Sequence, residues 1–297
     1  MMNMSLTVPY LEFYNGNKMP TFGLGTYSSK SNEVEEAVKY AIDIGYRYID
    51  TSYFLNNEKE VGKAIRGKIE DGTIRREDIF VATKLWNTFH KEEQVIPACI
   101  ESLKNLGLQY VDLYLIHFPI AFKKGKELFP VNTEGEIQTS DVDYLDTWKG
   151  MEECFRKGLV RDIGISNFNS EQITRLLASA TIKPVNNQVE LNININQKRL
   201  IEFCKNNGIT VTSYSPLGRP GYNSEIPNFL ENRKAQLGVA LIPRSLNGSR
   251  IKENFVIFDF QLKEDEMKIL ESIKTGKRII SFEELKDHKY YPFGIPF

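Results

Sequence analysis

The chain has 297 residues, a formal net charge of −1, 41% hydrophobic residues and 26% charged residues. This composition is typical of a soluble globular protein, and the near-neutral charge gives no reason to expect a nucleic-acid partner. The N-terminus lacks a basic segment followed by an apolar one, and no run of about 18 apolar residues occurs, so we expect neither a signal peptide nor a membrane span. We therefore expect a cytoplasmic protein with no membrane partner.

The three cysteines, Cys99, Cys154 and Cys204, are widely spaced, and each lies in a stretch with helical periodicity. This pattern favours buried, reduced thiols, and the functional alternative is a catalytic cysteine. With three histidines and no cluster of histidine and cysteine, we expect no metal site.

In chain order, the first signal is Asn15-Gly16, which predicts the turn of a β-hairpin before a short strand that ends at residues 23–26. Segments with the period of a helix then alternate with short apolar runs typical of strands. We expect helices at 32–44, 58–70, 92–106, 144–157, 171–177 and 197–206, with two more starting at Arg250 and Lys263. We expect strands at 46–50, 79–85, 111–117, 162–166, 185–189, 209–214 and 240–243, and a long polar loop at 119–142.

Strands that alternate with helices predict parallel pairing through right-handed crossovers. Eight strand candidates favour the α/β class, as a (β/α)₈ TIM barrel with an N-terminal hairpin, over a doubly wound sheet. The doubly wound alternative also lacks its GxGxxG fingerprint after a strand. Because no linker rich in Pro, Gly or Ser divides the chain, we expect a single domain over residues 1–297.

One unit of the predicted barrel is short. After the strand that ends at Tyr214, residues 219–228 form a loop rich in Gly and Pro. Only residues 229–238 remain before the last strand, which is enough for about three helical turns. Either the chain is shortened and still folds, or the barrel wall is open at its seventh helix.

Polar residues follow every predicted strand, at the end of the barrel where function resides in this fold. They are Thr26, Asp50, Lys84, His117, Ser166-Asn167, Gln188-Glu190, Tyr214-Ser215 and Arg244-Ser245. Each alone is compatible with a strand-end cap, but the set predicts a polar floor suited to a cofactor and a substrate carbonyl.

Within this floor, Lys84 and Asp50 are predicted to form a buried ion pair, which is better evidence of a tuned site than of stability. His117 ends a strongly apolar strand, so it is either a structural histidine or a donor that orients the substrate. Arg244 and Arg250 flank the start of a helix with Ser245, a pattern that favours a phosphate site over a solvated basic patch. Tyr214 can stack on a flat heterocycle or pack in the core.

Residues 44–62 read IGYRYIDTSYFLNNEKEVG, and this segment resembles the catalytic signature of the aldo-keto reductases. That family has Asp, then Tyr five residues later, then Asn-Glu after two more. Further similar motifs are MPTFGLGT, VATKLW, VDLYLIHFP, GLVRDIGISNF, NNQVELN, SYSPLG and LIPRSLNGSRIKENF. The resemblance runs over nearly the whole chain except for the gap before Gln236, where this chain is about two dozen residues shorter.

The resemblance implies an NADPH-dependent reductase of a small-molecule carbonyl compound, monomeric by family default. It places Asp50, Lys84 and His117 at catalytic positions. The cofactor positions that it implies are Gly25, Thr26, Asp50, Ser166, Asn167, Gln188, Tyr214, Ser215, Leu217, Arg244, Ser245, Arg250, Glu253 and Asn254. Arg244 stands where the family usually has Lys, and either residue favours NADPH over NADH. The substrate positions are Tyr27, Trp86, His117, Phe118 and Tyr291, the last in a C-terminal substrate loop that also contains Tyr290 and Phe293.

The departure from the family pattern is Leu55, which occupies the position of the proton-donating Tyr. Three replacements are conceivable: Lys84 donates directly, a water bridges to His117, or Tyr53 swings in. The primary hypothesis is therefore a carbonyl reductase with weakened activity. The alternatives are a catalytically silent NADPH-binding sensor, carrier or structural protein, and a poorly folded product without function.

Overall fold

The computed structural model describes residues 8–27, 31–125, 127–192, 194–218, 237–257, 262–272 and 276–295. Residues 219–236, which contain the short seventh unit apart from its last two residues, lie outside the described part of the chain. The predicted hairpin is present as β1 (Tyr10–Glu12) and β2 (Lys18–Pro20), which pair antiparallel across a turn where Gly16 has a φ of 87°.

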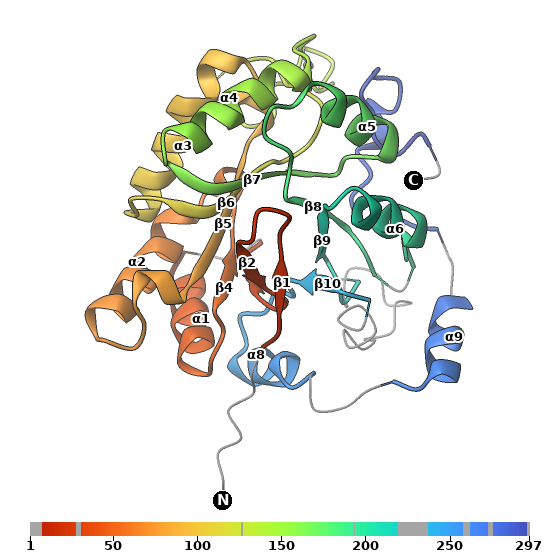
Figure 1. Cartoon of the computed structure of the whole chain (residues 1–297). Helices are drawn as coiled ribbons and strands as arrows, with labels where there is room; N and C mark the ends of the chain where they lie inside the picture. The colour runs from red at the N-terminus through yellow and green to blue at the C-terminus, as the bar shows by residue number, and fades with distance from the viewer. Residues whose placement is uncertain are drawn as a thin grey trace, which may run out of the picture.

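Eight parallel strands follow in sequential spatial order (Figure 1). They are β3 (Leu24–Gly25), β4 (Tyr48–Asp50), β5 (Phe80–Leu85), β6 (Val111–Ile116), β7 (Val160–Ser166), β8 (Asn186–Glu190), β9 (Thr210–Tyr214) and β10 (Val239–Leu241). The sheet follows the sequence order because each helical crossover returns the chain beside the strand that it just left.

The two outer strands of this sheet meet and close it. Phe22, just before β3, bridges Leu241 in parallel, and the backbone N–H of Gly23 donates to the Leu241 carbonyl at 2.8 Å. Gly25 N donates to the Pro243 carbonyl at 3.0 Å. A Cβ atom on Gly25 would lie 2.7 Å from the Ile242 carbonyl oxygen, so the seam requires a glycine there. The strands therefore form a closed ring, which confirms the predicted (β/α)₈ barrel.

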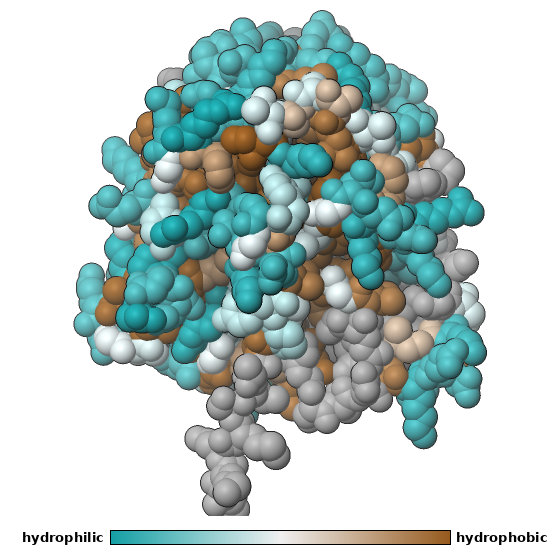
Figure 2. Space-filling view, viewed as in Figure 1, coloured by the Kyte–Doolittle hydropathy of each residue, from teal (hydrophilic) through white to brown (hydrophobic). Residues whose placement is uncertain are grey.

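The helices surround the ring (Figure 1). They are α1 (Ser31–Asp43), α2 (Glu58–Glu70), α3 (Glu92–Leu106), α4 (Tyr144–Arg156), α5 (Ser170–Ser179), α6 (Lys198–Asn206), α8 (Gly248–Phe255) and α9 (Glu264–Ser272). On the face seen in Figure 2, hydrophilic residues cover much of the described surface, with hydrophobic surface between them. Among the described residues, no helix is long and apolar enough to span a membrane.

The alternation of side chains along β5 separates two environments. Val81 and Leu85 point outward into the core between strands and helices, while Phe80 and Ala82 point into the barrel. Phe13 and Met19 of the hairpin region join the inner cluster and fill its N-terminal end. The polar residues are therefore left at the opposite end, where the strands finish.

Candidate active site

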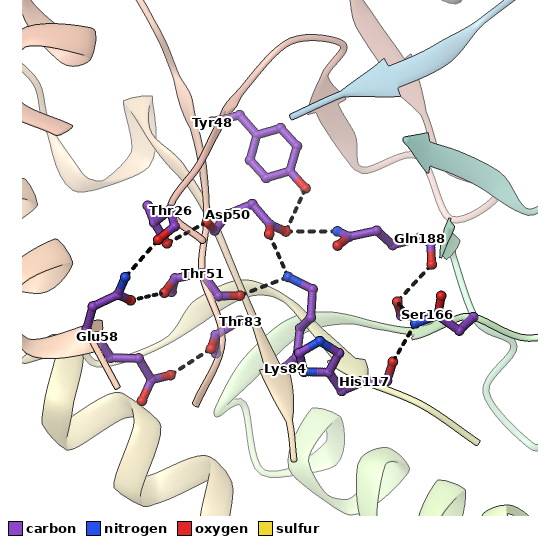
Figure 3. A network of polar contacts seen from close by, with 12 residues as sticks. Thr26, Tyr48, Asp50, Thr51, Glu58, Thr83, Lys84, His117, Ser166 and Gln188 are labelled. Carbon is purple, nitrogen blue, oxygen red and sulfur yellow. Dashed lines mark hydrogen bonds and ion pairs between the residues drawn. The ribbon is translucent and has the colours of Figure 1, made fainter. Parts of the chain in front are cut away.

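The predicted ion pair is formed. Lys84 Nζ lies 2.6 Å from Asp50 Oδ1, and the side chains of Lys84 and Asp50 are 5% and 6% exposed. Asp50 pairs with Ala82 across β4 and β5, so Lys84, two residues beyond Ala82, points to the same face one step higher. The ammonium also donates to the Thr51 carbonyl at 2.9 Å (Figure 3). A Lys ammonium has three N–H groups, and these two acceptors leave one for a ligand.

The second oxygen of Asp50 is also bound. Gln188 Nε2 donates to Asp50 Oδ2 at 2.8 Å, and the Tyr48 hydroxyl lies 3.4 Å from the same oxygen (Figure 3). Burial, and then the charge of Asp50, raise the pKa of Tyr48 well above its usual value, so Tyr48 stays protonated. The carboxylate is thus held in one orientation with Oδ1 on Lys84.

His117 follows β6 at the same end of the barrel. Burial, reinforced by the Lys84 ammonium, lowers the pKa of His117 well below its usual value, so the imidazole is neutral near pH 7. Its Nδ1 atom is enclosed and has no partner among the described residues. Buried N–H groups without an acceptor are rarer in proteins than buried acceptors without a donor. This favours the tautomer that carries its hydrogen on Nε2.

Leu55 ends the short 3₁₀ helix η1 (Tyr53–Leu55) after β4 and is half-buried. Its side chain brings no polar atom to this end of the barrel. The Tyr53 hydroxyl donates to Glu101 Oε1 of α3 at 3.2 Å, and its ring packs edge-on against Phe89. Tyr53 is therefore turned toward α3, which argues against it as the replacement donor.

The Asn57-Glu58 pair holds the connection between β4 and α2. Asn57 Oδ1 accepts from the Thr51 hydroxyl at 2.9 Å, and Asn57 Nδ2 donates to the Thr26 carbonyl at 2.8 Å. Glu58 Oε1 accepts from the Thr83 hydroxyl at 2.6 Å. Thr26 in turn donates its hydroxyl to the Asp50 carbonyl at 3.0 Å. These bonds fix the backbone on which Asp50 and Leu55 stand.

The residues expected at the nicotinamide are linked to one another across β6 to β9. Ser166 Oγ donates to the Gln188 carbonyl at 2.8 Å. Asn167, with a φ of 63°, donates its Nδ2 to the His117 carbonyl at 3.0 Å and accepts the Tyr214 hydroxyl at 2.8 Å. The barrel therefore brings Ser166, Asn167, Gln188 and Tyr214 together. Gly25 and Thr26 lie on the seam, while Ser215 and Leu217 are half-buried just beyond β9.

The residues expected at the 2′-phosphate gather around the start of α8. Asn247 Oδ1 caps the helix by accepting from the Arg250 backbone N–H at 3.2 Å. Arg244 and Arg250 are exposed at this end, Ser245 is buried beside them, and Arg244 Nε donates to the Tyr27 carbonyl at 2.9 Å. Glu253 and Asn254 follow in the last turns of the helix. Two cations at a helix N-terminus fit a phosphate group.

Most of the residues expected at the substrate lie in an aromatic cluster at the mouth of the barrel. Trp86 and Phe118 are each 2% exposed, Trp86 Nε1 donates to the Leu128 carbonyl at 2.7 Å, and the Tyr291 hydroxyl donates to the Ser281 carbonyl at 2.9 Å. Tyr27 stands apart, 40% exposed at the end of β3.

Several aromatic members of this cluster were not predicted from the sequence, among them Phe54, Phe129 and Phe282. Phe54 stacks on Trp86 with ring centroids 4.5 Å apart, Phe129 contacts both rings, and Phe282 packs on Phe118 at 5.1 Å. Phe54 could have been found, because it directly precedes Leu55. Phe129 and Phe282 lie in irregular segments whose spacing carries no signal.

The structure is thus a closed parallel barrel with Asp50, Lys84 and His117 at the carboxyl ends of its strands, the end at which enzymes of this fold carry their active sites. Among the described residues, no three His, Cys, Asp or Glu side chains gather to hold a metal ion. Residues 20–236 match the model of the Aldo/keto reductase family. The chain belongs to this family.

Prostaglandin-E(2) 9-reductase from Oryctolagus cuniculus is 42% identical over 309 positions, covering 94% of this chain and 96% of that protein. Because the 309 aligned positions outnumber the 297 residues here, that relative has residues that this chain lacks. The aldose reductase from Schistosoma japonicum superposes with a TM-score of 0.92 at 39% identity, covering 97% of this chain and 100% of that one. A Bombyx mori aldo-keto reductase in complex with NADP superposes with a TM-score of 0.86 at 38% identity, covering 96% of this chain and 99% of that one.

Proposed function

We propose that this protein is an NADPH-dependent carbonyl reductase whose turnover is lowered because Leu55 replaces the proton donor of its family. The observation that carries the proposal is the intact contact between Lys84 and Asp50, with His117 on the next strand, beside a side chain that cannot donate. Membership of the aldo/keto reductase family supports an aldehyde or ketone as the substrate.

The cofactor of this function is NADPH, and the described residues fit it. Arg244, Ser245 and Arg250 would hold the 2′-phosphate, with Glu253 and Asn254 toward the adenine. Ser166, Asn167 and Gln188 would hold the carboxamide, and Tyr214 would stack on the ring. When bound, NADPH supplies the hydride.

The chain's own residues must then stabilise the negative charge that develops on the carbonyl oxygen. Neutral His117 offers an Nε2–H as an orienting donor. Lys84 offers its remaining N–H and a positive charge that Asp50 fixes in place. We rank Lys84 first as the replacement proton donor, because its remaining N–H belongs to a buried cation that Asp50 and the Thr51 carbonyl hold in place.

The missing hydroxyl sets the size of the effect. Loss of a general acid typically lowers a rate by about 10²- to 10⁴-fold, which corresponds to roughly 3–5.5 kcal/mol of activation free energy. The groups that would orient the substrate and hold the cofactor stand at other positions of the barrel, among them His117 and Lys84. The activity is therefore expected to be weak rather than absent.

The test compares wild type, Leu55→Tyr and Leu55→Phe for NADPH oxidation with an aromatic aldehyde. We expect Leu55→Tyr to raise turnover by at least about tenfold, because it restores a general acid. Leu55→Phe supplies the ring without the hydroxyl and should stay at the wild-type level. Equal turnover in Leu55→Tyr and wild type would refute the proposal.

A second candidate, a catalytically silent NADPH-binding protein with a sensor or structural role, is favoured only by the apolar side chain at position 55. It predicts NADPH binding by fluorescence quenching with no oxidation on any carbonyl compound. Measurable wild-type turnover rules it out. For either function we propose a single domain and a cytoplasmic monomer.

A further inference from the structure

The Asn57 side chain stands at the start of α2 but does not cap this helix. Asparagine is preferred at the N-cap position, because its side-chain oxygen can accept from a backbone N–H of the first turn. Asn169 and Asn247 do this for α5 and α8, where they accept from the backbone N–H groups of Gln172 and Arg250. The Asn57 side chain makes no such bond to the first turn of α2, which the structure describes in full. Its amide therefore serves another purpose.

The Asn57 amide joins the ends of β3 and β4. Its Oδ1 atom accepts from the Thr51 hydroxyl at 2.9 Å, and its Nδ2 atom donates to the Thr26 carbonyl at 2.8 Å. Thr26 returns to β4 because its backbone N–H and its hydroxyl donate to the Asp50 carbonyl at 3.1 and 3.0 Å. Since Asp50 and Thr51 are consecutive residues, these bonds close a loop. All of its members are buried, so water does not compete for the bonds.

This loop includes the residue whose carbonyl holds Lys84. The Thr51 backbone N–H donates to the Ala82 carbonyl at 2.9 Å, and Asn57 holds the Thr51 side chain. Thr51 is thereby fixed on two sides, and its carbonyl accepts one N–H of Lys84 at 2.9 Å (Figure 3). Asp50 Oδ1 accepts a second N–H at 2.6 Å. Because the three N–H groups of an ammonium are arranged tetrahedrally, two fixed acceptors determine the direction of the third.

The direction of this third N–H matters because position 55 holds a leucine. Where a tyrosine delivers the proton, a neighbouring lysine supplies positive charge, and this attraction varies only gradually with distance. Where the lysine itself delivers the proton, its N–H must point at the acceptor, because a hydrogen bond weakens steeply below about 120°. A chain with Leu55 therefore depends on the orientation of Lys84 more than the same chain with a tyrosine.

We propose that Asn57 is a positioning residue that orients the third N–H of Lys84 for proton delivery, by holding Thr51 in place. The proposal rests on the proposed function, in which Lys84 replaces the missing acid. It adds a dependence on the side chain at position 55. Breaking the loop at Thr51 or Asn57 should lower turnover strongly beside Leu55 and weakly in the Leu55→Tyr variant.

The first arm of the test measures NADPH oxidation with an aromatic aldehyde. Thr51→Val removes the hydroxyl and keeps the shape of the side chain. Because small misplacements of a reacting group are costly, we expect it to lower kcat by at least about tenfold in the wild-type chain and by less than about threefold in Leu55→Tyr. Thr51→Ser restores the hydroxyl and should recover most of this loss. NADPH binding, followed by fluorescence quenching, should remain.

A second variant breaks the same loop from its other side. Asn57→Ala should show the same dependence on position 55, and it decides the test if Thr51→Val does not fold, as judged by thermal unfolding. Thr147→Val is the matched control, because Thr147 is also fully buried and its hydroxyl donates to the His90 carbonyl at 2.7 Å, outside the loop. Any loss of turnover in Thr147→Val should be equal in both chains.

Two kinetic results overturn the proposal. An equal loss from Thr51→Val in the wild-type chain and in Leu55→Tyr would mean that the loop serves only the fold. No loss in the wild-type chain would mean that Lys84 is oriented without the loop.

The second arm does not depend on turnover. In protein labelled with ¹³C-lysine, the two Hε protons of Lys84 give separate NMR signals if the side chain is held in one conformation, and the signals are assigned by their absence in Lys84→Met. We expect separate signals in wild type that merge in Thr51→Val. Signals that stay separate in Thr51→Val overturn the proposal. Absence of wild-type turnover refutes the proposed function, and merging in Thr51→Val would still establish that the loop holds Lys84.

Discussion

At the scale of single residues, the open question is which group delivers the proton next to Leu55. Lys84 is a buried cation of the strand-end floor, and two of its three N–H groups are taken by Asp50 and Thr51. Tyr53 is bound to Glu101, and Tyr48 lies below Asp50 with its pKa raised. The third N–H of Lys84 is therefore the donor that the arrangement leaves.

We predict that Lys84→Met lowers the residual turnover by about 10²-fold or more, because it removes the last general acid. Binding of NADPH, followed by fluorescence quenching, should persist. Because Asp50 would remain buried without its partner, the double variant Asp50→Asn/Lys84→Met is measured alongside to separate lost chemistry from lost stability. The exposed Lys63→Met serves as the control. If Lys84→Met turned over as fast as wild type, the proton for the carbonyl oxygen would have to come from another group.

The positions of Asp50, Lys84 and His117 could be predicted from the sequence, since each follows an apolar strand and parallel strands finish at one end. The contacts that these residues make were harder to predict. The hydrogen bond that Gln188, expected at the carboxamide, donates from its Nε2 to Asp50 was not predicted. The bonds that Glu190 accepts from the backbone N–H groups of Ile279 and Ile280 could not be foreseen either, because they depend on where the C-terminal segment lies.

At the scale of elements, the helical periodicity was accurate enough to give α2 and α3 with their observed bounds. β4 begins at Tyr48 rather than at Tyr46, because the Tyr46 N–H donates to Ala41 at the end of α1 after Gly45, which has a φ of 114°. β7 begins at Val160, two residues before the prediction, because Val160 pairs with Val111. Such ends depend on partners that are distant in sequence.

The attachment of the C-terminal segment to the barrel is a feature that periodicity does not reveal. Besides Glu190, the Tyr290 hydroxyl donates to Asp143 Oδ2 at 2.8 Å, and Gln172 Nε2 donates to the Tyr290 carbonyl at 2.9 Å. Asp143 is also held by Arg175 at 2.6 Å. The segment that carries Tyr291 is thereby fixed to β8, α4 and α5.

We predict that Glu190→Gln loosens this segment. The carboxylate accepts from backbone N–H groups through both oxygens, and the variant would place an NH₂ group against one of these donors. Hydrogen bonds to a charged group contribute about 1.5–3 kcal/mol, so the unfolding midpoint should fall by several degrees and proteolysis within residues 276–295 should increase. Glu284→Gln, at an exposed position, is the control. Unchanged midpoint and cleavage would show that Glu190 does not anchor the segment.

At the scale of the whole molecule, the closed ring of strands and the hairpin determine how the barrel is sealed. The sequence left open whether a short seventh unit opens the barrel wall. The hydrogen bond between Gly23 and Leu241 shows that the ring of strands is closed. The hairpin attaches to the barrel through Asp162 near the start of β7. Asn15 Nδ2 and Asn17 Nδ2 donate to its two oxygens at 2.7 and 3.0 Å.

This attachment makes the stability of the molecule depend on pH. Asp162 is 2% exposed, and burial raises its pKa to about 6, against the two amide donors that lower it. The folded state therefore holds this proton more tightly than the unfolded state, whose Asp has a pKa of about 3.9. The stabilisation is fully present below about pH 4 and is lost as pH rises through about 6.

We predict that Asp162→Asn removes this dependence. A shift of about two pKa units corresponds to roughly 3 kcal/mol in full. About 2 kcal/mol of this falls between pH 4.5 and pH 7.5, so the free energy of unfolding of the variant relative to wild type should rise by about 2 kcal/mol over that interval. The neutral amide keeps one oxygen for Asn15 or Asn17, so the hairpin contact survives. Urea unfolding at both pH values measures the difference, with the exposed Asp287→Asn as the control. Parallel pH curves for wild type and Asp162→Asn would mean that this carboxyl titrates alike in the folded and unfolded chains. The hairpin would then be held equally at both pH values.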